Sequence, residues 1–432
     1  METERKQDVS AARSVAFDIL RAVLTKGTPL DDALAVHDGL NMLPRRDRGF
    51  TRTIVGMTLR RLGQIDALIE TLIEKPLPRQ AAVVHDVLRL AVAELLFLDV
   101  APHAAVDSAV TLVESRGHPK FKGLVNAVLR RVSREGVERL KEFPVEINYQ
   151  PWMIESWQAS FGVEVAHAIA EYSLTQPPLD ISVRSNPEAW AEKLEATLLP
   201  TGTLRREFDG AITGLPGFDA GGWWVQDAAA ALPAKLLGDV KDKRVFDLCA
   251  APGGKTLQLA AMGANVLAVD RSSKRLKRLE RNLDRMGLRA GVAVADITGW
   301  TAPDRPDAIL LDPPCTATGT IRRHPDILHA KGIGDLNKLT TLQAKLLAKA
   351  AGMLQPGGRL VYCTCSQQSE EGEAQVARAL AELPLERDPV TVEELGGLDK
   401  LLTADGDVRT GPHLYPELGG FDGFFVARFR RV

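Results

Sequence analysis

The chain has 432 residues, of which 45% are hydrophobic and 25% charged, and its formal net charge at pH 7 is −2. This length allows about three domains of ~150 residues, each with its own core. No run reaches the roughly eighteen apolar residues of a membrane span, and the first residues lack the apolar centre of a secretory signal. We therefore expect a cytoplasmic protein. Four unevenly spaced cysteines do not make a disulfide framework in so large a protein, so we expect reduced thiols.

Basic residues are concentrated in a few segments, although the net charge is close to zero. Each segment alone is typical of a solvated helix face, whereas the four together favour a polyanionic partner. The segments are residues 45–48, 52–61, 130–134 and 271–285.

The first part of the chain has the pattern of α-helices. Apolar residues recur at helical spacing within residues 15–24, 65–74 and 83–98, and segments containing Gly or Pro separate these runs. Residues 121–132 combine an apolar stripe with an arginine end, which is typical both of a docking helix and of a core helix. We predict an all-α domain over residues 1–140.

Residues 145–222 have a mixed character. Residues 179–184 alternate like a strand, and a helix follows that begins at Asn186 with Pro187 in its first position. Another short run at 204–208 precedes a segment rich in Gly and Pro. We predict a small α+β domain here, of the RRM-like kind that binds RNA.

The remaining residues, 223–432, alternate between strand-like and helical runs. The strand-like runs are rich in Val, Ile and Leu, which predicts a Rossmann-like α/β domain with a parallel sheet covered by helices on both faces. We expect residues 424–430 to form a last strand at an antiparallel edge. The other predicted strands are residues 244–250, 265–270, 291–296, 307–312 and 358–365.

Residues 245–256, VFDLCAAPGGKT, combine a strand, a tight Gly-rich turn and the start of a helix. Unpaired amides at a helix N-terminus bind a carboxylate, a phosphate or a ribose at the carboxyl edge of a sheet. The turn is not a P-loop, because Cys249 stands where that motif needs its first glycine, and the pattern G-x-G-x-x-G is absent.

Acidic residues stand at the ends of three successive predicted strands. They are Asp247, Asp270 and Asp296. Asp270 is placed to accept the two hydroxyls of a ribose, and Asp296 to accept an adenine amino group. Each aspartate alone also fits a helix cap. As a set they predict S-adenosylmethionine as the ligand.

The predicted strand at 307–312 delivers Asp312 and Cys315 to the same edge, on either side of two prolines that stiffen the turn. An aromatic residue after Asp-Pro-Pro would suit methylation of an adenine amino group. Cys315 occupies that place, which favours different chemistry.

The predicted strand at 358–365 ends at Cys365, and a helix containing Glu370 and Glu371 is expected to follow. A helix N-terminus close to Cys365 would favour its thiolate. Zinc is a poor alternative, because Cys-x-Cys lacks a second ligand pair, so we expect no metal. We interpret Cys363 as a core residue, and the same alternative exists for Cys365.

Two thiols and an acid suit methylation of carbon 5 of a pyrimidine. That carbon is too weak a nucleophile to attack a methyl sulfonium unaided, but addition of a thiolate to carbon 6 gives it the electron density of an enamine. A second group must then remove the carbon 5 proton before the thiol can leave.

These residues resemble the Sun-type ribosomal RNA cytosine-5 methyltransferases that carry an N-terminal NusB-like domain. The resemblance covers the whole of the predicted α/β domain and extends into the helical one. The matching segments are residues 102–110, 121–132, 226–230, 247–256, 312–315, 322–326, 364–366 and 422–429, with the acids Asp270 and Asp296.

The resemblance implies that Cys365 is the nucleophile, that Cys315 assists release and that Asp312 lies near the target base. The sequence departs from the family's D-A-P-C-S pattern at Pro313 and Thr316, next to these groups, which concerns the fit of the substrate more than the reaction type. The predicted cofactor contacts are Cys249, Ala250, Ala251, Pro252, Gly253, Gly254, Lys255, Asp270, Arg275, Asp296 and Asp312.

We therefore predict a monomeric, S-adenosylmethionine-dependent methyltransferase that acts on carbon 5 of a cytosine in small-subunit ribosomal RNA. The base would be flipped into the pocket while basic helices bind phosphates. The alternatives are a non-catalytic RNA-binding or ribosome assembly factor, and a methyltransferase for transfer RNA or another RNA. Methylation of an adenine amino group would leave Cys365 unexplained.

Overall fold

The computed structural model describes residues 2–207, 210 and 212–432. By its contacts the chain divides into two compact units. The first contains the chain up to residue 154 together with residues 321–331, and the second contains residues 155–320 and 332–432. Met1, Phe208, Asp209 and Ala211 lie outside the described residues, so the predicted run at 204–208 is followed only to Glu207. None of the helices described is both long enough and apolar enough to cross a membrane.

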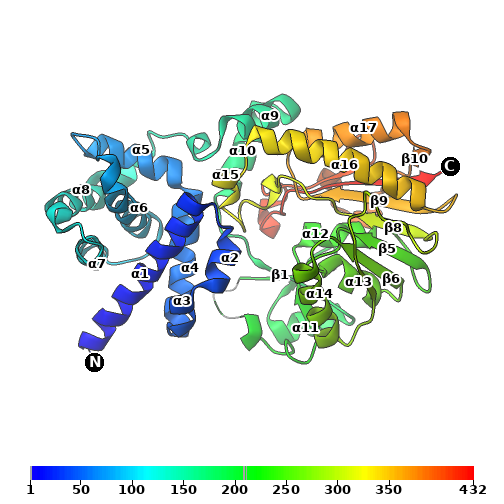
Figure 1. The fold of residues 1–432 in the computed structure, drawn as a ribbon, viewed down its shortest axis with the longest axis horizontal. Helices are drawn as coiled ribbons and strands as arrows, with labels where there is room; N and C mark the ends of the chain where they lie inside the picture. Colours follow the sequence, from blue (N-terminus) through cyan, green and yellow to red (C-terminus); the bar gives the residue numbers. More distant parts are fainter. Residues whose placement is uncertain (1, 208–209, 211) are drawn as a thin grey trace. The chain divides into compact units, whose positions relative to one another are not determined.

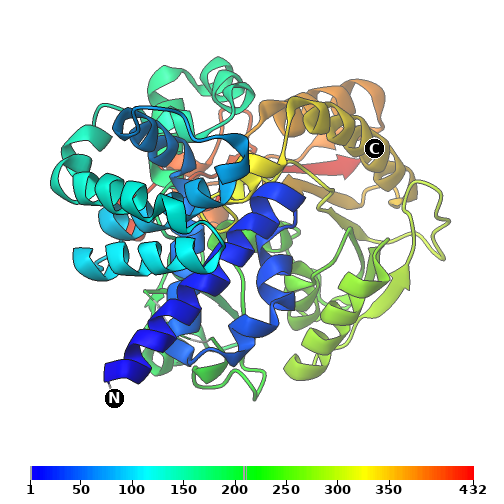
Figure 2. The ribbon, with the colours of Figure 1, turned by 60° about the vertical axis from the view of Figure 1, so that its left-hand side comes forward.

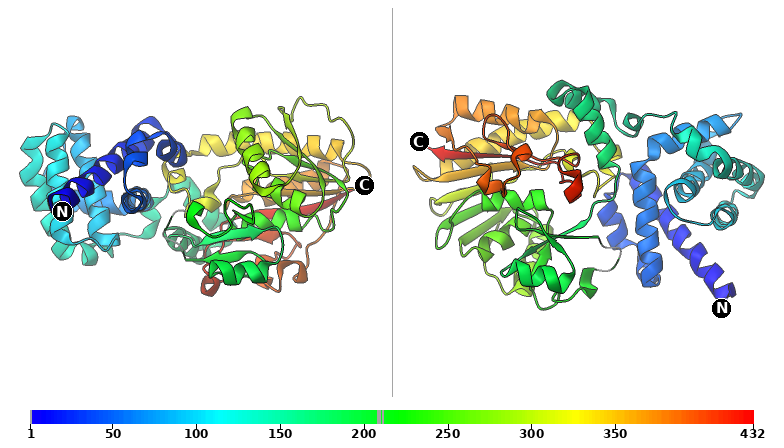
Figure 3. Two further views of the ribbon diagram at one scale, coloured as in Figure 1. Left: turned by 90° about the horizontal axis from the view of Figure 1, so that it is seen from below. Right: turned by 180° about the vertical axis from the view of Figure 1, so that it is seen from behind.

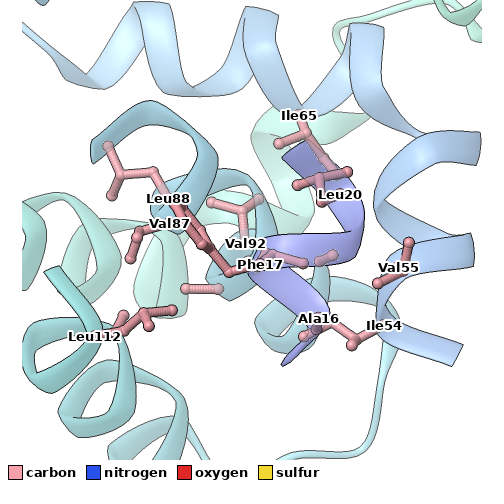
Figure 4. Close-up of a cluster of buried hydrophobic side chains, with 14 of the residues drawn as sticks. Ala16, Phe17, Leu20, Ile54, Val55, Ile65, Val87, Leu88, Val92 and Leu112 are labelled. Carbon is pink, nitrogen blue, oxygen red and sulfur yellow. The ribbon is translucent and has the colours of Figure 1, made fainter. Parts of the chain in front are cut away.

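The first unit is helical, and α1 runs through it with the other helices around it (Figures 1 and 2). Apolar residues at helical spacing on α1, including Ala16, Phe17 and Leu20, are buried against α4, α5, α6 and α7 (Figure 4). The helices are α1 (Glu2–Lys26), α2 (Leu30–Val36), α3 (Asp38–Met42), α4 (Arg45–Arg60), α5 (Leu62–Leu72), α6 (Ala82–Phe97), α7 (Pro102–Ser115) and α8 (Lys122–Leu140).

A segment from late in the sequence completes this helical unit. Residues 321–331, which include the short helix α15 (Ile327–Ala330), are bound to it by hydrogen bonds. The backbone N–H of Leu30 donates to Asp326 over 3.1 Å, and the Arg60 guanidinium donates to the Arg322 carbonyl over 2.5 Å. The chain therefore passes between the two units three times, after residues 154, 320 and 331.

The second unit begins within α9 (Pro151–Phe161) and contains a small antiparallel sheet of four strands in the order β2-β3-β1-β4. Ile181, Leu194, Leu204 and Trp223 form its buried core. Its elements are α10 (Val163–Ser173), β1 (Leu179–Val183), α11 (Pro187–Leu194), β2 (Thr197–Leu198), β3 (Leu204–Arg206) and β4 (Trp223–Val225).

An eight-stranded sheet forms the rest of this unit, in the order β10-β12-β9-β8-β5-β6-β7, with β11 pairing with β12. Helices cover both faces, with α12, α13 and α14 on one face and α16 and α17 on the other (Figures 1 and 3). The elements are α12 (Ala228–Lys235), β5 (Arg244–Leu248), α13 (Gly254–Ala261), β6 (Asn265–Asp270), α14 (Ser273–Met286), β7 (Gly291–Val294), β8 (Ala308–Leu311), α16 (Ile333–Met353), β9 (Arg359–Thr364), α17 (Glu373–Glu382), β10 (Leu385–Arg387), β11 (Val408–Arg409) and β12 (Phe425–Arg431).

The three predicted fold classes, all-α, α+β and α/β, are those observed, with one difference in the sheet. Strand β12 is antiparallel, as expected, but it lies between β9 and β10 and not at an edge. Its side chains are buried on both faces, with Phe425 and Phe429 on one and Val426 on the other, which fits an interior strand.

The register of the parallel strands aligns their carboxyl ends. Leu248 at the end of β5 is opposite Val269 of β6 and Leu311 of β8, and Leu311 is opposite Tyr362 of β9. The segments that follow these strands therefore leave the sheet at the same edge. This edge receives the Gly-rich turn, Asp270, Asp312 and the two cysteines Cys315 and Cys365.

Candidate active site

The Gly-rich turn between β5 and α13 is held against its neighbours. The N–H of Ala250 donates to the carbonyl of Val269 over 3.1 Å. Gly253 has φ +107°, and a Cβ at this position would lie 2.6 Å from Cγ of Leu279, so both the backbone and the space require glycine. The close approach of α14 thereby fixes the start of α13 at the carboxyl edge.

Asp270 is buried at the end of β6, with 3% of its surface exposed. Its two carboxylate oxygens accept the N–H groups of Ser272 and Ala251, over 2.8 and 3.1 Å. Arg275 lies 3.9 Å from the same carboxylate and donates to the carbonyl of Ala251. Each carboxylate oxygen keeps a lone pair for a further donor, so the fixed side chain can still bind a pair of hydroxyls.

Asp296 lies two residues beyond the end of β7 and is exposed. It accepts the N–H and the hydroxyl of Thr298 over 2.9 and 2.7 Å, and these hydrogen bonds lower the pKa of its carboxyl group. The aspartate therefore closes a local turn at residues 296–298, and its charge is kept at the same edge of the sheet as Asp270.

Asp247 lies beneath the Gly-rich turn and is buried. Thr256 of α13 donates its hydroxyl to one carboxylate oxygen over 2.5 Å, while the other oxygen is buried without a protein partner among the described residues. Burial raises the pKa of Asp247 to about 7, more than the Thr256 hydrogen bond lowers it. This side chain anchors α13 and also keeps one buried oxygen for another donor.

Lys255 and Asp312, predicted to contact the cofactor and the target base, form one ion pair. The Lys255 ammonium donates to the Asp312 carboxylate over 2.7 Å. Burial lowers the pKa of Lys255, but the charge of Asp312 outweighs it and the net pKa lies above its ordinary value. The lysine therefore stays cationic and fixes Asp312 where the chain leaves β8.

The thiols of Cys315 and Cys365 meet at this edge, with their sulfurs 3.4 Å apart. The hydrogen bond with Cys365 and burial raise the pKa of Cys315 well above its ordinary value. Cys363 is buried in the sheet core, as expected. Cys249 lies in the Gly-rich turn, where burial raises its pKa. Two of the four cysteines are thus brought together.

The helix expected to follow Cys365 with Glu370 and Glu371 forms only as a short 3-10 turn. A 3-10 turn at Ser369–Glu371 precedes α17, which begins only at Glu373. The reason is that Glu371 turns inward, where the N–H of Thr316 donates to its carboxylate over 2.9 Å. Three residues separate Cys365 from this 3-10 turn, so no α-helix begins directly after the thiol in the described segment that follows β9, and the expected effect of a helix N-terminus on Cys365 stays a prediction.

Sequence reasoning missed the polar side chains around the thiols, chiefly Glu371 and Gln343. Glu371 was expected only as part of a helix, and Gln343 lies on α16. Both are fully buried and contact the segment that contains Cys315. A polar run, Ser366 to Glu371, directly after an apolar strand was the available signal, but it does not identify the partners.

The edge fits S-adenosylmethionine, which carries an ammonium, a carboxylate and two ribose hydroxyls. Asp270 can accept hydroxyls, and the free amides at the start of α13 suit a carboxylate. The buried Asp247 oxygen suits a cationic or N–H group. The donors and acceptors present thus match the polar groups of this cofactor.

Comparisons with known proteins agree with this fold. Residues 234–430 match the model of the 16S rRNA methyltransferase RsmB/F family, and residues 10–134 match that of the NusB family. The crystal structure of PH0851 has the same fold, with a TM-score of 0.76 and 24% sequence identity, covering 98% of this chain and 99% of that one.

The similarity to curated proteins extends over nearly the whole chain. Ribosomal RNA small subunit methyltransferase B of Cronobacter sakazakii is 32% identical, covering 96% of this chain and 97% of that protein. The Pseudomonas putida protein of the same name is 34% identical, covering 97% and 98%. The resemblance seen in the sequence motifs is thereby confirmed. The chain belongs to the RsmB/F family of S-adenosylmethionine-dependent methyltransferases, in the branch that carries an N-terminal NusB domain.

Proposed function

We propose that this protein methylates carbon 5 of a cytosine in small-subunit ribosomal RNA, through a covalent bond between enzyme and base. The observation that carries the proposal is the pair of thiols, 3.4 Å apart, at the sheet edge that also holds the Gly-rich turn. The relatives named above are small-subunit ribosomal RNA methyltransferases, which supports this class of RNA as the substrate.

Cys365 is the nucleophile in this proposal. Its sulfur bonds to carbon 6 of the cytosine, and the electron pair of the 5,6 double bond moves to carbon 5. The raised pKa of Cys315 makes that thiol the poorer initial nucleophile, because it keeps its proton near neutral pH. Cys315 can instead donate a hydrogen bond to the Cys365 sulfur.

Cys315 acts in the last step. Once the Cys365 sulfur is bonded to carbon, its hydrogen bond and charge no longer hold the proton on Cys315, so the second thiol can ionise. The Cys315 thiolate then takes the proton from carbon 5, the ring double bond re-forms, and the carbon–sulfur bond breaks with its electrons returning to Cys365. The proton that Cys315 loses on ionising goes to solvent, which balances the positive charge that the sulfonium loses with its methyl group.

S-adenosylmethionine, when bound, supplies the electrophilic methyl group that carbon 5 receives. We assign its binding to the turn from Cys249 to Lys255, with Asp270 and Arg275 at the ribose side and Asp296 at the adenine side. Lys255 acts through its ion pair with Asp312, which keeps that carboxylate near the target base. The N–H groups at the start of α13 suit the carboxylate of the cofactor.

Binding of the RNA is assigned to basic surfaces in both units. Lys274, Lys277, Arg278 and Arg281 are exposed on α14, directly after Asp270, and exposed arginines recur on α4. We propose residues 1–140 and 145–222 as RNA-binding modules and residues 223–432 as the catalytic module. One chain is enough, because both thiols and the cofactor turn belong to it. We also propose that the protein works in the cytoplasm, which its similarity to bacterial ribosomal RNA methyltransferases supports.

The test separates the two thiols. We expect Cys365→Ala to abolish methylation and to form no covalent adduct, because the enamine cannot be made. Cys315→Ala should still attack and methylate, but proton removal fails, so enzyme and methylated RNA stay joined. Each variant is incubated with small-subunit ribosomal RNA and S-adenosylmethionine, and a slow band that nuclease removes is sought on a denaturing gel.

Cys363→Ala is the matched control, since Cys363 precedes the nucleophile by two residues on β9 and is buried in the core. It should methylate and release RNA normally. An adduct with Cys365→Ala and none with Cys315→Ala would reverse the two roles. Full activity in both variants would exclude the thiol mechanism, and adducts formed only with transfer RNA would correct the substrate.

A further inference from the structure

We propose that Glu371 is a positioning residue for Cys315: its carboxylate fixes the backbone after this thiol, so that Cys315 can reach the carbon 5 proton in the last step of catalysis. The inference rests on the proposed function and adds a group to it. Glu371 touches neither sulfur in this role and acts only through the segment that contains Cys315.

The Glu371 side chain binds the residue next to Cys315. It is fully buried, with 0% of its surface exposed. The N–H of Thr316 donates to the two carboxylate oxygens over 2.9 and 3.1 Å, and the Thr316 hydroxyl donates to the carboxylate as well. The backbone and the side chain of Thr316 are therefore held against one buried carboxyl group.

Gln343 of α16 extends this contact to the other side of Cys315. Its amide donates to the Glu371 carboxylate over 2.9 Å and to the carbonyl of Pro314, also over 2.9 Å. The residue before Cys315 and the residue after it are therefore bound to the same pair of buried side chains. This arrangement leaves the Cys315 backbone little freedom to move.

Glu371 is itself held in place from two directions. The hydroxyl of Tyr362 on β9 donates to the Glu371 carbonyl over 2.8 Å. In the same 3-10 turn, Ser369 bonds to Ser160, and Glu370 accepts the hydroxyl of Ser156 over 3.0 Å, both serines lying on α9. A side chain on so constrained a turn can serve as a fixed point for a neighbouring segment.

The positions of the two thiols depend on Glu371 to different degrees. Cys365 directly follows β9, so the sheet places it. Cys315 lies on the irregular segment after β8, between Pro314 and the 3-10 turn Thr318–Thr320, and it needs side chains to place it. Loss of Glu371 should therefore impair the step that uses Cys315 more than the step that uses Cys365.

The departure from the family pattern at Thr316 fits this role. A threonine keeps the hydroxyl of the serine that the pattern has there, and this hydroxyl binds Glu371 and approaches the hydroxyl of Ser366 at 3.1 Å. The segments that carry the two thiols are thus joined by hydroxyl groups on both sides. A residue without a hydroxyl would lose these bonds while keeping the backbone contact.

The experiment measures two quantities for Glu371→Ala and Glu371→Gln: the rate of methylated product release and the fraction of enzyme trapped as RNA adduct. We expect Glu371→Ala to lower release at least tenfold while the trapped fraction rises several-fold, as in Cys315→Ala. Glu371→Gln keeps one acceptor oxygen for the Thr316 N–H and should recover part of the release rate. Glu382→Ala, which removes an exposed acid that pairs with Arg378 at the end of α17, is the control and should leave both quantities unchanged.

A structural role would give a different result. Release and adduct formation would then fall together, with no rise in the trapped fraction, and that outcome would overturn the proposal, as would wild-type behaviour of Glu371→Ala. If Glu371→Ala does not fold, Glu371→Gln decides the question in the same way, because a positioning role predicts a trapped fraction above that of the wild type. Absence of an adduct with Cys315→Ala itself would instead overturn the proposed function, and the positioning role with it.

Discussion

The helical unit and the carboxyl edge of the large sheet both bury ionisable side chains, but they satisfy them differently. In the helical unit, Nε of Arg13 on α1 donates to both carboxylate oxygens of Glu94 on α6, over 2.9 and 3.0 Å, and Nη2 donates to one of them over 2.5 Å. Both side chains are almost fully buried. At the sheet edge, one oxygen of Asp247 is buried without a protein partner among the described residues, and Cys315 has another thiol as its neighbour.

In the helical unit, two buried charges stabilise the fold by binding each other, whereas at the sheet edge a buried acid remains available to a ligand. In a buried ion pair with complete hydrogen bonding, each charge is compensated by its partner. Removing one partner leaves the other charge buried without compensation. A buried carboxylate with an open acceptor position carries a cost in the free protein that a ligand can remove. The following experiments test this contrast, from the largest expected effect to the smallest.

Breaking the Arg13–Glu94 pair should have the largest effect on stability. We expect Arg13→Ala or Glu94→Ala to lower the free energy of unfolding by ~3 to 5 kcal/mol, because one buried charge is left without its partner. Chemical denaturation followed by circular dichroism measures this. The double variant Arg13→Met with Glu94→Leu is the control, and its stability should lie close to that of the wild type. Equal losses in the single and double variants would show that packing, not charge, determines the effect.

Asp247 should lower stability at high pH. Its pKa is about 7 in the folded protein and 3.8 in a model compound, so between these values the folded state keeps a proton that the unfolded state has lost. Rising pH therefore destabilises the fold through this group, by an amount on the order of 4 kcal/mol above pH 7. Asp247→Asn should be more stable than the wild type at pH 8, with the difference vanishing near pH 4. A constant difference across this range would contradict the assignment.

Asp270 should contribute to cofactor affinity, in addition to holding the N–H groups of Ser272 and Ala251. Asp270→Ala loses charge-assisted hydrogen bonds worth ~1.5 to 3 kcal/mol, so binding of S-adenosylhomocysteine should weaken about ten- to a hundredfold. Titration calorimetry measures this, with thermal unfolding as the check on folding. Unchanged affinity in a folded variant would place the ribose elsewhere.

Surface charges should have the smallest effect per residue, visible in the salt dependence of RNA binding. Neutralising Arg45, Arg46 and Arg52 on α4 should lower the slope of log affinity against log salt by about one for each lost phosphate contact. Binding of S-adenosylhomocysteine should not change. The same measurement after neutralising Lys274, Lys277 and Arg278 on α14 compares the two units. A wild-type slope for the α4 variant would make the helical unit a docking module for a protein.

Much of the sheet edge could be predicted from sequence because its signals are local. The runs that end at Asp270 and Asp312 are apolar and contain β-branched residues, so the sequence indicates where each strand ends. Parallel strands bring such carboxyl ends to one edge of the sheet. The turn at Gly253 could be predicted for the same reason, because glycine and proline are typical of turns. These features depend on residues that are neighbours in the chain.

The partners of Glu371 were not predictable in this way. Thr316 is 55 positions away in the sequence, and Leu30 is 296 positions away from Asp326. No periodicity reports such pairings, because they depend on how complete elements pack. The helical reading of Glu370 and Glu371 was locally reasonable, and it was overridden by the burial of one side chain against a distant backbone N–H.

The position of residues 321–331 in the helical unit has a consequence for synthesis of the chain. A ribosome makes the chain up to residue 154 first, but the Arg322 carbonyl that Arg60 binds and the buried Leu328 emerge only after about 170 further residues. The helical unit therefore stays incomplete while the small sheet and much of the large one are being made. Domains usually mature in the order of translation. Here the first unit is completed only after the second crossing of the chain, when residues 321–331 have been made, while residues 332–432 of the second unit still follow.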